Sequence, residues 1–204
     1  MAGFSFFGNQ QQNRSEAPLS ERVLLERKYE AGRANLMIAI VLTAINIFAP
    51  IFGATFYFMF SLHVPSALIS SGMLYCGLYP EEIYTELGLE GVIFLDSAYF
   101  YLFLIGAVVI TLVYVLCWFM SKGNKVGWMI AATVLFAIDT AVIFLGGFSA
   151  DLLIDILFHA WVLYYLIVGI ISHFKLAKLP REEESVQYES VLDAFSNPDP
   201  NNME

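Results

Sequence analysis

The sequence predicts an all-helical membrane protein, a polytopic bundle of four transmembrane helices with an outer interfacial or re-entrant segment. Three observations support this prediction. Hydrophobic residues fill 58% of the 204 positions and charged residues only 14%, a balance too apolar for a soluble domain of this length. The apolar residues fall into blocks that are almost free of charge and about as long as a bilayer is thick. All ten Lys and Arg residues lie in three clusters, and residues 34–121 contain none.

The chain begins with a polar segment. Residues 1–18 are rich in Gln, Asn, Ser and Gly and have little to bury, so they are predicted to form a disordered cytoplasmic tail. A membrane domain then covers residues 19–175. Residues 19–33 combine strong helix formers with alternating Glu and Arg or Lys, which predicts an amphipathic lead-in helix. The first span follows at about 35–51 and ends because of Pro50 and Gly53.

Residues 56–77 are apolar enough to span a membrane, but His63, Pro65 and several serines weaken a span there. The positive-inside rule places all three basic clusters in the cytoplasm. A chain that starts inside and returns inside at 122–125 crosses an even number of times, and spans 35–51 and 98–120 already supply two crossings. Residues 56–77 are therefore predicted to lie in the outer interface or to re-enter the membrane. The alternative is five spans with one basic cluster on the wrong side.

The outer segment as a whole covers residues 52–97 and is acidic. Its charged side chains are Glu81, Glu82, Glu86, Glu90 and Asp96. These carboxylates are expected to keep the segment hydrated and on the outer side of the membrane.

Two further spans are predicted at 126–148 and 152–171, joined to the rest by short loops. Trp118 and Trp128 bracket the loop before the third span, at the level where indole rings sit among lipid headgroups. Residues 176–204 are acidic and rich in Pro and Asn, which predicts a second disordered cytoplasmic tail. The predicted location is the cell (plasma) membrane, with both termini in the cytoplasm.

Soluble-enzyme chemistry has little support in the sequence. No dinucleotide, phosphate-loop or zinc-protease motif occurs, and Cys76 and Cys117 lack metal-ligand spacing. The net charge of -9 comes largely from tails and loops and identifies no partner. The sequence therefore predicts no cofactor, no metal ion, no nucleic-acid partner and no recognisable reaction centre.

One buried polar constellation stands out in the last two spans. Asp139 lies near the middle of its span, where a charged aspartate costs about 2.5–3.5 kcal/mol. In the next span Asp151, Asp155 and His159 are four residues apart and share one side of a helix. An antiparallel hairpin of these spans places Asp139 and His159 at similar depth, so they can meet. Asn46, in the outer half of the first span, can complete the network.

This constellation has two interpretations. As a functional site, Asp139, Asp155 and His159 would bind a cation or relay a proton, because intramembrane ionisable groups often mark such pathways. As a structural clamp, the same groups would specify how helices pack where lipid provides no hydrophobic driving force. The clamp is favoured, because transporters usually have more spans, paired broken helices or internal repeats.

The predicted function follows from the clamp. We expect a non-catalytic accessory or assembly component of the membrane, with the lipid bilayer and other membrane proteins or copies of itself as partners. The alternative is a small cation- or proton-coupled transporter or channel that uses the Asp and His cluster.

The segments AIDTAVIFL (137–145) and DLLIDILFHAWVLYYLIVG (151–169), with HFKLAKLP (173–180), resemble an uncharacterised family of small multi-span membrane proteins from Gram-positive bacteria. The resemblance covers mainly the last two spans and the first. It implies a bacterial cell membrane and supplies no activity, substrate or site residue.

Overall fold

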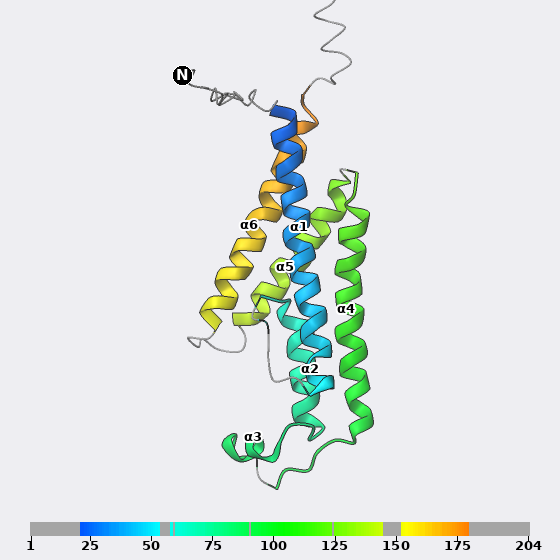
Figure 1. Ribbon diagram of the computed structural model, residues 1–204, viewed down its shortest axis with the longest axis vertical. Helices are drawn as coiled ribbons and strands as arrows, with labels where there is room; N and C mark the ends of the chain where they lie inside the picture. The colour runs from blue at the N-terminus through cyan, green and yellow to red at the C-terminus, as the bar shows by residue number, and fades with distance from the viewer. Residues whose placement is uncertain are drawn as a thin grey trace, which may run out of the picture.

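A computed structural model gives the fold and describes residues 21–53, 58, 60–89, 91–123, 125–144 and 152–179. Every regular element in these ranges is helical (Figure 1). The long helices are α1 (Glu21–Phe48), α4 (Phe100–Met120), α5 (Val126–Ile143) and α6 (Leu152–Leu176). The short elements are η1 (Pro50–Phe52), α2 (His63–Tyr75), α3 (Glu81–Glu86) and η2 (Ser97–Tyr99).

Within the described residues, four helices are long and apolar enough to cross a membrane, which confirms the predicted fold class. The predicted lead-in helix and first span form one continuous helix, α1, because no helix-breaking residue separates them. Helix α6 continues to Leu176, beyond the predicted end of its span. Residues 145–148 of the predicted third span and both predicted disordered tails, apart from residues 176–179, lie outside the described residues.

The ends of the long helices fall into two groups (Figure 1). The start of α1, the end of α6 and the turn between α4 and α5 lie toward one end of the bundle, and α3 lies at the other. This arrangement agrees with the even number of crossings inferred from the basic clusters. Which end faces the cytoplasm stays a prediction.

Helix α2 occupies part of the ambiguous stretch 56–77. Its 13 residues make it about 20 Å long, well short of the roughly 30 Å of a bilayer core. It begins about halfway along the bundle and runs toward the end that carries α3 (Figure 1). It packs mainly against α4. We call it the half-helix. Its length and position fit the re-entrant form predicted for this segment, and its place in the bilayer stays a prediction.

The outer segment closes over the far end of α2. Gly77 adopts a left-handed conformation with φ 66°, which ends the helix and turns the chain. The hydroxyl of Tyr84 in α3 donates to the carbonyl oxygen of Met73, and the backbone N–H of Leu95 donates to that of Tyr75. These bonds satisfy carbonyl groups that the helix end leaves without partners.

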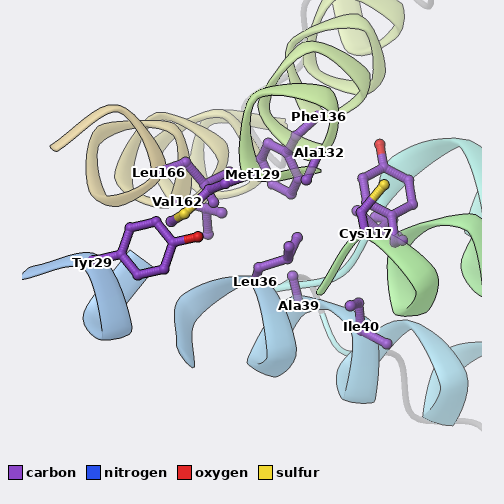
Figure 2. Packing of buried hydrophobic residues seen from close by; sticks show 12 residues of the cluster. Tyr29, Leu36, Ala39, Ile40, Cys117, Met129, Ala132, Phe136, Val162 and Leu166 are labelled. Atoms are coloured by element: carbon purple, nitrogen blue, oxygen red, sulfur yellow. The ribbon is translucent and has the colours of Figure 1, made fainter. Parts of the chain in front are cut away.

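The buried core lies between α1, α4, α5 and α6 (Figure 2). Leu36 and Ala39 of α1 face Phe136 of α5, and Val162 and Leu166 of α6 and Cys117 of α4 belong to the same cluster. All six side chains are almost fully buried. The cluster fixes α5 and α6 against α1 and so sets the depth at which their polar residues lie.

A second set of contacts joins α1 to the end of α4. The buried guanidinium of Arg33 donates through Nε to Ser121 Oγ at 3.1 Å, and its carbon lies 5.4 Å from the Trp118 ring centre. The Tyr29 hydroxyl donates to the carbonyl oxygen of Ser121 at 2.8 Å. A cation at a helix C-terminus is favourable because it offsets the negative end of the helix dipole.

Candidate functional site

The buried carboxylate of Asp139 joins three helices. Its Oδ2 atom accepts a hydrogen bond from the backbone N–H of His63, and Oδ1 accepts one from that of Val64, both at 2.8 Å. The Nε2 atom of His159 lies 3.1 Å from Oδ2. Asp139 is only 3% exposed and His159 only 1%. The carboxylate of α5 thus touches the first residues of α2 and a side chain of α6.

Asp139 caps the N-terminus of the half-helix α2 from another helix. Leu62 precedes α2 and has no polar side chain to cap it. The first backbone N–H groups of a helix have no partner within the helix, and inside a membrane no water replaces one. Asp139 binds the first two of these groups, and Pro65, at the third position, has no N–H to satisfy. A carboxylate is favourable there because a helix N-terminus is the positive end of its dipole.

The hydrogen bonds of His159 determine how many protons the pair holds. Its Nδ1 atom lies 2.7 Å from the backbone carbonyl oxygen of Asp155. A carbonyl oxygen only accepts, so Nδ1 carries a proton. The contact between Nε2 and Asp139 needs a second proton, which lies on either Nε2 or the carboxyl oxygen. With that proton in either place the pair has zero net charge, and without it two lone pairs would face each other.

The chain reaches the start of α2 through an entry segment, defined as residues 58 and 60–62. Asn46 of α1 pairs with the backbone of Phe58: its Nδ2 donates to the carbonyl oxygen at 2.6 Å, and its Oδ1 accepts from the N–H at 2.8 Å. Nδ2 also lies 2.8 Å from Ser61 Oγ. The hydroxyl of Thr43 accepts from the N–H of Leu62 at 2.8 Å. Side chains of α1 therefore satisfy backbone groups that a non-helical segment exposes.

The predicted site residues are thus divided between two places. Asp139 and His159 meet, as the hairpin argument predicted. Asn46 does not join them, because its side-chain hydrogen bonds go to the entry segment. Asp155 contributes its backbone carbonyl, while its buried Oδ1 atom has no hydrogen-bond partner in the described part of the chain. Asp151 lies outside the described residues.

Sequence reasoning missed the backbone of the half-helix as the partner of Asp139. It also missed Thr43, Ser61 and Ser66, whose hydroxyls bond within and around the entry segment. One signal was available in the sequence. Proline favours the first turn of a helix, so Pro65 indicates a helix start in mid-stretch and not only a weakened span.

The site does not have the composition of a metal centre. Among the described residues, no group of three or more His, Cys, Asp or Glu side chains is placed to hold a metal ion. Cys76 and Cys117 are buried and unpaired. The chemistry that the site offers is hydrogen bonding and the holding of one proton.

Comparison with known proteins adds nothing to this geometry. The chain matches no known family, no curated protein and no solved structure.

Proposed function

We propose that this chain is a non-catalytic integral membrane component, an accessory or assembly subunit, in which the Asp139 and His159 pair is a structural clamp. The observation that supports the clamp best is that both carboxylate oxygens of Asp139 bind the start of α2. A carboxylate that caps its own protein's helix is a poor transport ligand, because releasing it would expose two unpaired N–H groups.

The neutrality of the pair supports the same role. A cation that entered next to Asp139 would have to displace the proton shared with His159 and would lose the contact that joins α5 to α6. In transporters, half-helix N-termini commonly face the anionic substrate. Here the protein's own carboxylate occupies that position.

We further propose that the chain lies in a cell membrane with both termini in the cytoplasm. The basic clusters support this orientation through the positive-inside rule. The described ends of α1 and α6 share one end of the bundle with the α4–α5 turn (Figure 1). The exposed apolar side chains of the four long helices would then contact lipid, other membrane proteins or a second copy.

A second candidate function is proton or cation transport. It is favoured by Asp155, whose Oδ1 atom is buried without a hydrogen-bond partner among the described residues. Such an atom one helical turn from His159 would extend a chain of ionisable groups beyond the clamp.

Reconstituted vesicles separate the two functions. The purified protein, Asp139→Asn and Asp155→Asn are compared with empty vesicles for proton and potassium flux, using a trapped pH-sensitive dye and an imposed ion gradient. The clamp predicts flux no greater than in empty vesicles for all three proteins, with reduced thermal stability for Asp139→Asn. Protein-dependent flux that both substitutions abolish, in variants that still melt cooperatively, would show transport and refute the clamp as the main role.

A further inference from the structure

Three residues from different helices meet near the α4–α5 turn. The Tyr29 hydroxyl of α1 donates to the backbone carbonyl oxygen of Ser121, the residue that follows α4, at 2.8 Å. The rings of Tyr29 and His173, on α6, have their centres 5.7 Å apart. These three residues therefore mark one level across the bundle, near the end where α1 starts and α6 finishes (Figure 1).

Four basic residues lie next to this contact. Each is one or two positions along the chain from Tyr29, Ser121 or His173, and they are Arg27, Lys28, Lys122 and Lys175. Two positions of a helix are a rise of only about 3 Å, so cations from three separate elements come to the same level. All four residues are exposed. We call this set the basic layer.

The basic layer has no anionic partner in the described part of the chain. The salt bridges at this end join Arg22 to Glu26 and Arg33 to Glu30. The described residues here include eight Lys and Arg and only three Glu, and two of those glutamates are already paired in these bridges. The layer therefore carries positive charge that the described protein does not neutralise.

The length of α4 places the basic layer relative to a bilayer. Helix α4 carries no charged residue, and its 21 residues span about 31 Å, close to the roughly 30 Å of a hydrocarbon core. Ser121 follows its last residue and so lies where hydrocarbon gives way to headgroups. Since Lys122 is the next residue and the other three cations share its level, the whole layer lies among the headgroups.

An anionic phospholipid headgroup fits this position. Its phosphate already lies in the layer, whereas a protein partner would have to enter it. In a zwitterionic lipid the headgroup's own amine offsets the phosphate, so only an anionic lipid supplies the missing charge. Exposed apolar side chains stand beside the cations and can contact acyl chains: Phe119 is 62% exposed and Phe174 is 50% exposed.

We propose that the basic layer binds the headgroup phosphate of an anionic phospholipid, whose acyl chains lie against exposed apolar side chains of α4 and α6. This site is separate from the Asp139 and His159 pair. It goes beyond the structural role proposed above, and it depends neither on the clamp nor on which end of the bundle faces the cytoplasm.

Tryptophan fluorescence can report the bound lipid, because brominated acyl chains quench an indole that they touch. The chain has three tryptophans. Trp161→Phe removes the one that lies 12 positions, or about 18 Å, from His173. Trp118 and Trp128 remain, and Trp128 is 37% exposed. The full chain with this substitution is placed in phosphatidylcholine vesicles that contain increasing fractions of brominated phosphatidylglycerol or brominated phosphatidylcholine.

We expect phosphatidylglycerol to quench with at least tenfold stronger association than phosphatidylcholine. Raising the salt from about 0.1 M to about 1 M shortens the screening length from about 10 Å to about 3 Å and should reduce this preference in the unchanged layer. Inorganic phosphate added at constant ionic strength should leave the preference intact, because the proposed ligand is the lipid.

Paired variants test the layer itself. Lys122→Gln combined with Lys175→Gln should lower the preference at least fivefold, since one basic residue near a membrane surface contributes about 1 kcal/mol, a factor of about five. Lys122→Arg with Lys175→Arg keeps the charge and should keep the preference. The matched control is Arg22→Gln with Lys178→Gln, which removes the same charge seven and five positions from Tyr29 and His173 and should have a smaller effect.

Four outcomes would overturn the proposal. The first is equal quenching by the two lipids, and the second is an equal loss of preference in the layer variant and its matched control. The third is displacement of the lipid by inorganic phosphate, which would indicate a site for a soluble anion. The fourth is a preference that appears only when Glu182, Glu183 and Glu184 are replaced by Gln, which would mean that the chain's own acidic segment holds the cations.

Discussion

Asp139 and His159 lie on neighbouring helices, with Oδ2 and Nε2 within hydrogen-bonding distance at 3.1 Å. The same carboxylate holds the first two amides of α2. Three helices that share few other polar contacts therefore meet at one side chain. The consequences for stability differ between substitutions that preserve some of these bonds and substitutions that remove all of them.

Asp139→Ala leaves two amides and an imidazole without partners and is expected to lower the free energy of unfolding by about 3–5 kcal/mol. Asp139→Asn keeps one acceptor for the amides and should cost about 1–3 kcal/mol. A thiol-reactive fluorogenic dye measures both, because Cys76 and Cys117 are buried and unpaired and react only on unfolding.

The control for this series is Asp155→Asn, since Asp155 is similarly buried but its Oδ1 atom has no partner. We expect Asp155→Asn to lower the free energy of unfolding by less than half as much as Asp139→Asn. Equal losses for the two substitutions would contradict the role of Asp139 as the cap of α2.

Asn46→Ala is expected to loosen the entry segment, because Phe58 and Ser61 lose the side chain that binds them. The site for measurement is His63→Cys in a chain without its two native cysteines. Its rate of reaction with a membrane-permeant maleimide should rise several-fold when Asn46 is replaced. Asn35→Ala on the same helix should leave the rate unchanged, since Asn35 bonds Ala31 and Trp161 instead.

Two glycines give a graded test of the contact between α1 and α6. A Cβ at Gly32 would lie 2.9 Å from the backbone carbonyl oxygen of Tyr165 and would also meet Met129. A Cβ at Gly169 would meet chiefly the flexible end of Met129, at 2.7 Å. Thermal unfolding of Gly32→Ala should therefore show a loss of about 1–3 kcal/mol, and that of Gly169→Ala a smaller one.

Gly127→Ala serves as the control, because nothing lies within 4 Å of its Cβ position. We expect it to be neutral or to stabilise α5 by up to about 1 kcal/mol, through the better helix propensity of alanine. A larger loss at Gly169 than at Gly32 would show that the backbone contact does not limit the packing.

Arg33→Gln should lower stability by about 1.5–3 kcal/mol, because Ser121 and Trp118 lose a charged hydrogen-bond donor. Arg27→Gln, at an exposed position of the same helix, should change it by less than about 0.5 kcal/mol. Arg33→Lys keeps the charge but not the planar guanidinium group, so its loss of stability should lie between those of Arg33→Gln and Arg27→Gln. Similar melting temperatures for Arg33→Gln and Arg27→Gln would show that the buried arginine adds nothing.

The orientation in the membrane can be tested with single cysteines in a chain without its native ones. Lys122→Cys in the α4–α5 turn and Glu86→Cys in α3 are both exposed in the structure. An impermeant maleimide added to intact cells should label Glu86→Cys and spare Lys122→Cys until the membrane is opened. The reverse pattern would invert the topology and leave the helix contacts as they are.

The fold could be predicted from the sequence because its main determinants are simple. Long apolar blocks separated by the charge clusters around Arg33 and Lys122 leave few ways to thread a chain through a bilayer. The meeting of Asp139 with His159 was predictable too, because four-residue spacing and a short hairpin fix their depth. These arguments need only helix geometry and the cost of burying charge.

The rest depended on backbone groups, which carry no residue-specific signal. Asp139 binds the amides of His63 and Val64, and any other residue except proline would present the same N–H. Asn46 was expected to join Asp139 because it is a polar residue in the outer half of the first span. Its side-chain amide instead forms hydrogen bonds with the backbone of Phe58 in the non-helical entry segment. Only Pro65 hinted at where that segment ends.

The residue that caps α2, Asp139, lies far along the chain from the amides that it binds. It follows His63 by 76 positions and Val64 by 75. A ribosome that feeds this protein into a membrane therefore delivers the half-helix long before its partner is synthesised. Until α5 is inserted, the two leading amides have no carboxylate, and water outside the bundle is their best alternative. We therefore expect α2 to dock only after α5 has been inserted, so that the carboxyl-terminal hairpin sets the timing of this step.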